Sequence, residues 1–181
     1  MSANIPPQPH AHAPEPWLRG TMQDIHAVPR AVLHALELAG EDLHRWCDGL
    51  SDAEVKASPF GLTPLAFHLR HIARSLDRLL TYAEGNLLSD QQLVALKTES
   101  DPSANRQQLF AELTDALAKS AQRVAMLGSA NFEAPRVVGK KALPTSLGGL
   151  LVHIADHTQR HVGQAVTTAK LLLAQRTAKY R

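Results

Sequence analysis

The chain has 181 residues, of which 44% are hydrophobic and 20% charged, and its formal net charge is +2. This composition is typical of one globular domain with a sizeable core. The small net charge argues against partners such as nucleic acid or an anionic membrane. No apolar run approaches the roughly 20 residues of a membrane-spanning helix. The single cysteine, Cys47, excludes an intramolecular disulfide and a thiolate-only zinc site.

The N-terminal segment differs in composition from the rest of the chain. Residues 1–19 are rich in proline and polar side chains, which predicts a disordered tail ahead of one domain over residues 20–181. The segment has neither a basic n-region nor an apolar h-region, so it does not read as a secretory signal. With only one cysteine in the chain, we expect a cytoplasmic protein.

Leucine-rich segments with three- and four-residue spacing predict four amphipathic helices. They lie within residues 29–50, from Thr63-Pro64 to about Gly85, from Asp101 to Gly128, and from about Ser146 to about Gln175. Residues 89–98 are compatible with a further short helix, and residues 129–146 are expected to form an eighteen-residue loop. Without a credible strand pattern, the predicted fold class is all-α, a four-helix bundle.

The last helix carries histidines at four-residue intervals in the segment "LLVHIADHTQRHVGQ". At about 100° per residue, His157 and His161 lie in the middle of the apolar stripe and His153 lies on its flank. A pair of imidazoles one turn apart is the local geometry that zinc metalloproteases use. A third ligand from a facing helix would leave an open position, as in catalytic zinc sites. The alternative is that these are core or boundary histidines hydrogen-bonded to their neighbours.

The second helix offers His68 and His71 in "FHLRHIARSLDRLL". On a helical wheel centred on Leu65, His68 lies nearer the apolar stripe than His71 does. Periodicity alone therefore favours His68 as the inward residue.

These two histidine segments resemble those of the DinB-like superfamily. This group of four-helix metalloenzymes includes YfiT-type proteins and mycothiol- and bacillithiol-dependent transferases. The likeness rests on "HIARS" from His71 and on His157 and His161, the second of which is followed by "VGQ". The resemblance spans roughly residues 20 to 175. It implies a site for Zn²⁺ or Ni²⁺ made by His71, His157 and His161, and so selects His71 over His68.

Other polar residues near the motifs have two interpretations each. His68 or His153 could supply a fourth ligand, and His153 could instead orient a ligand or be a boundary residue. Asp156 and Gln164 could likewise support a ligand. Arg74 and Arg160 could bind an anionic group of a substrate, although paired surface charges are the simpler interpretation. Cys47, Trp46 and Tyr82 are expected to be packing residues.

Three functions fit these observations. The first is a metal-dependent enzyme acting on a small molecule, either as a thiol S-transferase with a low-molecular-weight thiol as cosubstrate or as a hydrolase. No glutamate adjoins the histidine pair, which favours thiol chemistry over hydrolysis. The second is a non-catalytic metal-binding or stress-response module, and the third is a helical bundle without a metal. All three are compatible with the homodimer that we expect.

Overall fold

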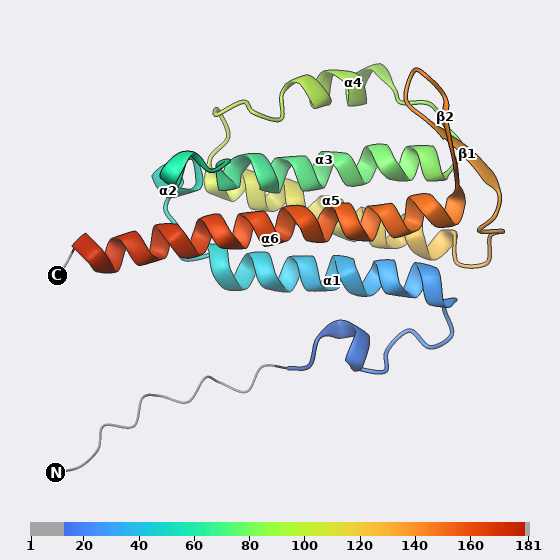
Figure 1. The fold of residues 1–181 in the computed structure, drawn as a ribbon, viewed down its shortest axis with the longest axis horizontal. Helices are drawn as coiled ribbons and strands as arrows, with labels where there is room; N and C mark the ends of the chain where they lie inside the picture. The colour runs from blue at the N-terminus through green and yellow to red at the C-terminus, as the bar shows by residue number, and fades with distance from the viewer. Residues whose placement is uncertain (1–12, 180–181) are drawn as a thin grey trace, which may run out of the picture.

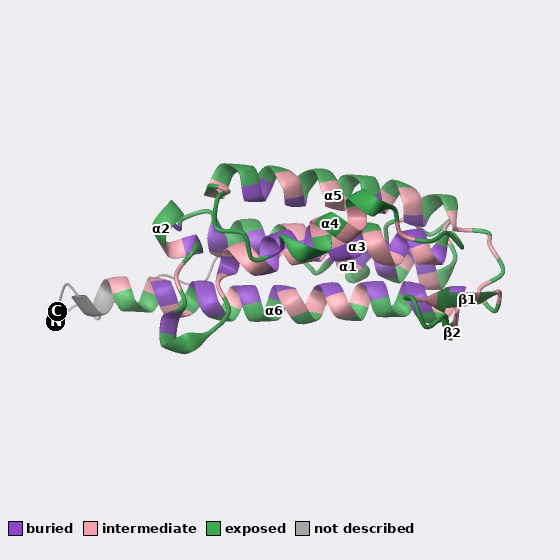
Figure 2. Ribbon diagram, turned by 90° about the horizontal axis from the view of Figure 1, so that it is seen from above, coloured by how far each residue is buried: buried purple, intermediate pink, exposed green. Residues whose placement is uncertain are grey.

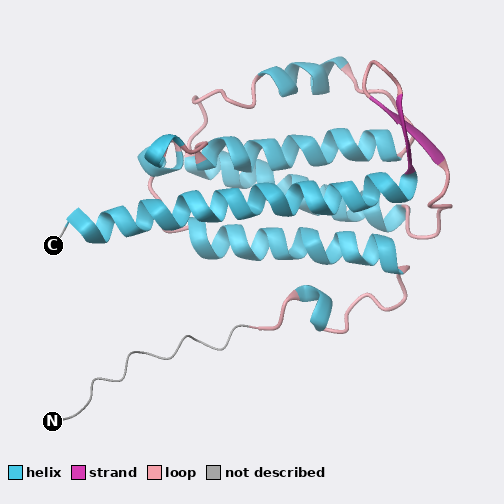
Figure 3. Ribbon diagram, in the orientation of Figure 1, coloured by secondary structure: helices cyan, strands magenta, loops and turns pink. Residues whose placement is uncertain are grey.

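The computed structural model describes residues 13–179 and confirms the all-α fold class (Figure 1). The four long helices are α1 (Ala27–Cys47), α3 (Leu65–Ala83), α5 (Arg106–Met126) and α6 (Leu147–Lys179). The short helices are α2 (Asp52–Val55) and α4 (Asp90–Lys97), with 3-10 turns at η1 (Pro16–Leu18) and η2 (Pro59–Gly61). The strands β1 (Pro135–Val138) and β2 (Leu143–Ser146) form a small hairpin, and the rest of the described chain is loop (Figure 3).

The four long helices form a closed bundle in which each helix contacts two others. Helix α1 packs on α5 and α6, and α3 packs on the same two helices from the opposite corner. Buried residues gather on the faces that these helices turn toward one another (Figure 2). The leucine stripe predicted for α3 is part of this core, since Leu65, Leu69, Ile72 and Leu76 are fully buried. Helix α4 lies outside the bundle, alongside α3 (Figure 1).

Capping sequences determine where α4 and α5 begin. Ser89 forms a capping box with Gln92 at the start of α4, and Asn105 forms one with Gln108 at the start of α5. The predicted start of the third helix at Asp101 was therefore too early. The Asp101 side chain instead accepts hydrogen bonds from the backbone N–H and the hydroxyl of Ser103, and it closes a turn before the helix.

The expected loop over residues 129–146 contains the β1–β2 hairpin, which the sequence did not predict. The strands are antiparallel, with Pro135 opposite Ser146 and Val138 opposite Leu143. Arg136 donates from Nε to the carbonyl oxygen of Ala83 at 2.6 Å and so fixes the hairpin to the end of α3. Ala83 is about 18 Å along the helix axis from His71, at 1.5 Å per residue. The hairpin therefore does not cover the histidines.

The N-terminal part of the described chain contacts α1. Of the tail predicted over residues 1–19, residues 1–12 lie outside the described residues. The η1 turn contacts α1, and Arg19 pairs with Glu37 at 2.8 Å and with Glu41 at 2.6 Å. None of the helices within residues 13–179 is both long enough and apolar enough to cross a membrane.

One ion pair connects α2 to the C-terminal part of α6 and predicts a pH-dependent contribution to stability. Arg176 donates to Glu54, and this hydrogen bond is the largest cause that lowers the pKa of Glu54 to about 2. A carboxylate with a lowered folded-state pKa stabilises the fold above its unfolded-state pKa and loses that effect as the pH falls through about 2.

We expect Glu54→Gln to lower the free energy of unfolding at neutral pH by about 1 kcal/mol or less, because the pair is partly exposed to solvent. Glutamine still serves the capping box that Ser51 forms with residue 54, so the substitution tests the charge. Urea unfolding of both proteins should show a difference that shrinks from about pH 5 toward pH 2. An unchanged difference across this range would show that the charge does not cause it.

Candidate metal centre

Three histidines from two helices converge in the bundle. His71 comes from α3, and His157 and His161 lie one turn apart on α6. One ligand atom of each histidine lies within 4.8 Å of those of the other two. The centroid of the His71 ring is 5.1 Å from that of His157 and 4.3 Å from that of His161. The three residues that the resemblance selects therefore share one place in the fold and could hold a divalent metal ion.

The spacing between His71 and His157 suits two ligands of one metal. Their Nε2 atoms are 3.3 Å apart. Two nitrogens that each lie ~2.1 Å from a tetrahedral Zn²⁺ are separated by ~3.4 Å. The pair therefore has the separation that such an ion requires.

His71 is oriented by a carboxylate on its other ring nitrogen. Its Nδ1 lies 2.7 Å from Oε2 of Glu99, and Arg78 donates to the second oxygen of that carboxylate at 2.6 Å. An ionised carboxylate only accepts hydrogen bonds, so Nδ1 of His71 carries a proton, and the tautomer of the neutral ring that this contact favours has its lone pair on Nε2. A carboxylate behind a histidine in this way is typical of metal ligands.

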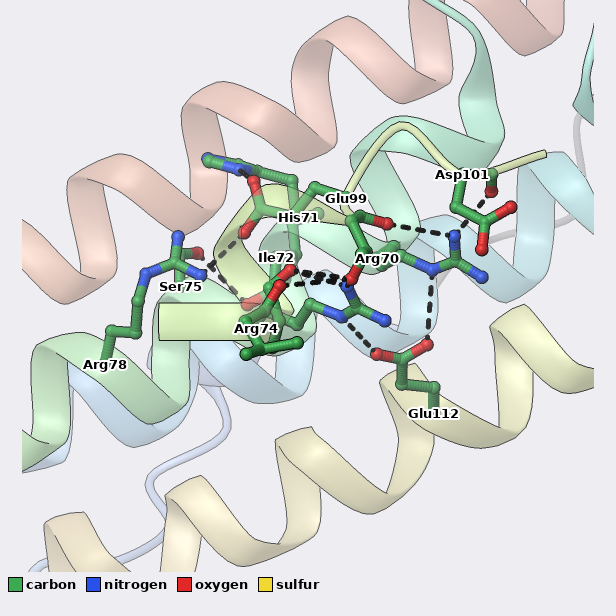
Figure 4. A network of polar contacts seen from close by, with 12 residues as sticks. Arg70, His71, Ile72, Arg74, Ser75, Arg78, Glu99, Asp101 and Glu112 are labelled. Carbon is green, nitrogen blue, oxygen red and sulfur yellow. Dashed lines mark hydrogen bonds and ion pairs between the residues drawn. The ribbon is translucent and has the colours of Figure 1, made fainter. Parts of the chain in front are cut away.

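Glu99 is buried but remains ionised. Burial raises its pKa, but the hydrogen bonds from His71 and Arg78 outweigh burial and leave the pKa below its ordinary value. Figure 4 shows Glu99 between these two residues. The site thus contains a fixed negative charge next to one candidate ligand, which favours a cation there.

His157 has a buried ring nitrogen that has no hydrogen-bond partner among the residues that the structure describes. This atom is Nδ1, and Nε2 of the same ring faces Nε2 of His71. If both rings are neutral and carry their proton on Nδ1, two lone pairs face each other at 3.3 Å. A cation held by His71 and His157 would satisfy both lone pairs, so the donor set fits a divalent metal.

His68 lies behind His161. The Nδ1 atoms of the two rings are 3.2 Å apart, within hydrogen-bond distance, which leaves Nε2 of His161 for a metal. Periodicity favoured His68 as the inward residue, and His68 is indeed buried, at 3% exposure. His68, the more buried of these two α3 histidines, contacts the candidate ligand His161 and is not itself one of the three clustered histidines. The partly exposed His71 belongs to that cluster. The two residues are three positions apart on one side of α3, so both face α6.

Burial keeps His157 and His161 in the protonation state that metals bind. Burial, with smaller contributions from the neighbouring imidazoles, lowers the pKa of His157 and of His161 to about 4. Both rings are therefore neutral near pH 7, and neutral imidazole is the ligating form. The pKa of His68 is also lowered to about 4, chiefly by burial.

The other polar residues singled out in the sequence lie outside this cluster. His153 is exposed, and its Nδ1 is 3.8 Å from the carboxylate of Asp156. Asp156 pairs with Arg160 at 2.6 Å. Arg74 donates to Glu112 at 2.8 Å and belongs to the contacts between α3 and α5. The ring of His153 lies 5.4 Å from that of His157 between centroids, but the group of described residues that could hold a metal ion is His71, His157 and His161.

A cavity of about 320 Å³ is lined by His68, the residue that contacts His161. It lies between the segment before α3 and one face of α6, and its lining includes Leu62, Thr63, His68, Arg160, Gln164 and Thr168. Gln164, a candidate for supporting a ligand, thus faces this cavity. The volume is at the lower end of the range found for small-molecule sites.

Cys47, Trp46 and Tyr82 are packing residues, as expected. Cys47 is fully buried, and burial raises the pKa of its thiol to about 12, so it is not a nucleophile. Trp46 and Tyr82 pack against the core, and Lys170 lies 4.1 Å above the ring of Trp46.

Comparison with known families agrees with this geometry. The family model of the DinB superfamily matches residues 35–165, which is more than half of the chain. The chain belongs to the DinB superfamily. Comparison with curated proteins and with solved structures gave no match. In this DinB-superfamily protein the matched region contains all three clustered histidines and also Glu99.

Glu99 and Arg78 were not singled out from the sequence. Glu99 lies in the segment between α4 and α5, where nothing local indicates that its carboxylate reaches His71. The available signal was the four-residue spacing of Arg70, Arg74 and Arg78, which places three cations on one side of α3 and predicts acidic or carbonyl partners there.

Proposed function

We propose that this protein is a metal-dependent enzyme in which His71, His157 and His161 hold Zn²⁺ or Ni²⁺, and that it transfers a low-molecular-weight thiol to a small electrophile. The observation that carries the proposal is the convergence of three imidazoles whose ligand atoms lie within 4.8 Å of one another. Such an ion supplies Lewis acidity and lowers the pKa of a coordinated thiol or water. The histidines contribute imidazole ligands from two packed helices.

A set of three protein ligands would leave one position on the ion open, which supports an enzyme over a closed metal-binding module. Nδ1 of His68 is engaged with Nδ1 of His161, and His153 is exposed. Within residues 13–179 the cluster contains three histidines. Three protein ligands and one position for a small molecule are the arrangement of catalytic zinc sites, whereas structural sites have four protein ligands. A non-catalytic metal-binding module is the second candidate, and a fourth protein ligand would favour it.

The state of Glu99 supports thiol transfer over hydrolysis. Hydrolysis benefits from a carboxylate that takes a proton from the attacking water. Both oxygens of Glu99 already accept hydrogen bonds, one from His71 and one from Arg78. A thiol needs less help of this kind, because its pKa is already close to neutral.

The 320 Å³ cavity beside His68 supports a small-molecule substrate. Arg160, Gln164 and Thr63 line it and offer a cation, an amide and a hydroxyl to polar groups of the substrate. In the proposed enzyme these side chains bind and orient the molecule beside the histidines. The homodimer and the cytoplasmic location remain predictions from the sequence.

Parallel assays of the two reactions test the proposal. Protein loaded with Zn²⁺ or Ni²⁺ is incubated with a small thiol and a chromogenic haloarene, and separately with an activated ester. We expect metal-dependent loss of the thiol that a chelator abolishes and that His157→Ala lacks. Ester hydrolysis without thiol transfer would favour the hydrolase. Metal binding without either activity would favour the non-catalytic module.

A further inference from the structure

Three arginines along one side of α3 hold the end of α4 and the segment that follows it. Arg74 donates to the carbonyl oxygen of Ala95 at 2.7 Å and to the hydroxyl of Thr98 at 2.9 Å. Arg70 donates to the carbonyl oxygen of Asp101 at 2.5 Å. Together with the contact from Arg78 to Glu99, these bonds fix residues 95–101 against α3 (Figure 4).

Within this segment, Glu99 is the residue that reaches the histidines. Its side chain is 7% exposed, in a connecting segment where charged side chains normally face water. Burying a carboxylate is costly unless it is paired and hydrogen-bonded. The partners of Glu99 are Arg78 on one oxygen and His71 on the other. Arg78 compensates the negative charge of Glu99. The contact between Glu99 and His71 connects residues 95–101 to the candidate metal centre.

We propose that Glu99 is a positioning residue for the metal centre, held in place by Arg78 and by the contacts of Arg70 and Arg74 with residues 95–101. Glu99 fixes His71 in the tautomer with the proton on Nδ1 and keeps its Nε2 directed at His157. Phe67 stacks on the His71 ring with centroids 5.1 Å apart and limits its rotation from the other side. This inference rests on the proposed function, because it assumes that His71 binds a metal.

The test compares Glu99→Gln with Glu112→Gln. Both substitutions remove a carboxylate that an α3 arginine contacts, but the ion-pair partners of Glu112 within residues 13–179 are Arg70 and Arg74 and not a histidine. Affinity for Zn²⁺ and Ni²⁺ is measured by competition with a chromogenic chelator. We expect Glu99→Gln to weaken binding by about 10- to 100-fold. Glu112→Gln should bind within about threefold of wild type, and circular dichroism should show equal helicity.

A second readout examines the tautomer without metal. Long-range ¹H–¹⁵N correlation spectra of the metal-free protein should show His71 protonated on Nδ1 in wild type and in Glu112→Gln. In Glu99→Gln the preference for that tautomer should weaken, because an amide can donate to Nδ1 as well as accept from it. Glu99→Asp, which keeps the carboxylate, should restore part of the metal affinity.

Two results separate this inference from the proposed function. Equal metal affinity in wild type and Glu99→Gln, with wild type binding tightly, overturns the positioning role alone. Wild-type protein that binds neither ion overturns the proposed function and the positioning role with it.

Discussion

Replacing His157 or His161 by alanine is expected to lower metal affinity by more than about 100-fold, because each substitution removes one of three ligands. Losing a ligand costs more affinity than losing a residue that hydrogen-bonds to a ligand, for which the loss is about 10- to 100-fold. The bundle should remain helical. Both histidines are only partly buried, and the apolar contacts of α6 come from neighbours such as Ile154 and Val162, which are buried. Affinity is measured by chelator competition, and helicity by circular dichroism.

His153→Ala is the matched control for these substitutions. It removes a histidine from the same helix, one turn before His157, whose side chain is exposed and outside the cluster. Its metal affinity should stay close to that of wild type. If His153→Ala abolished binding while His71→Ala did not, the assignment of the ligands would be wrong.

The second large effect is expected on stability. A metal ion that binds only the folded protein stabilises it by about 4 kcal/mol when its free concentration is 1,000 times the dissociation constant. For a chain of this size, that corresponds to an increase in Tm of about 10 °C. Thermal unfolding with and without the ion, in a metal buffer that fixes the free concentration, measures the shift. Excess chelator should reverse it.

The same experiment with His157→Ala separates a specific site from general ion effects. The variant should show little or no increase in Tm at the metal concentration that stabilises wild type. An equal increase in both proteins would mean that the ion acts elsewhere, and His10 and His12, which lie outside the described residues, would be the next histidines to replace.

The bundle could be predicted from sequence because its helices are long and strongly periodic. Leu65, Leu69 and Ile72 follow the three- and four-residue spacing, and all of them are buried. The hairpin could not be predicted because its strands have four residues each and one of them begins with Pro135. In segments this short, the alternation of apolar and polar residues does not distinguish a strand from a loop.

The site was predictable only in part, because some of its residues are brought together by the packing of separate segments. The positions of His157 and His161 follow from the geometry of one helix, so a helical wheel places them together. The choice between His68 and His71 depends on how α3 faces α6, and the resemblance, not the periodicity, pointed to His71. The role of Glu99 depends on the path of a connecting segment, which local sequence does not determine.

The most direct test of a three-histidine metal centre is the metal content of the purified, tag-free protein. Elemental mass spectrometry is applied in parallel to wild type and to His157→Ala. The geometry of His71, His157 and His161 predicts close to one Zn or Ni per chain in wild type and little in the variant. Wild-type protein without metal, even after reconstitution with both ions, would contradict it.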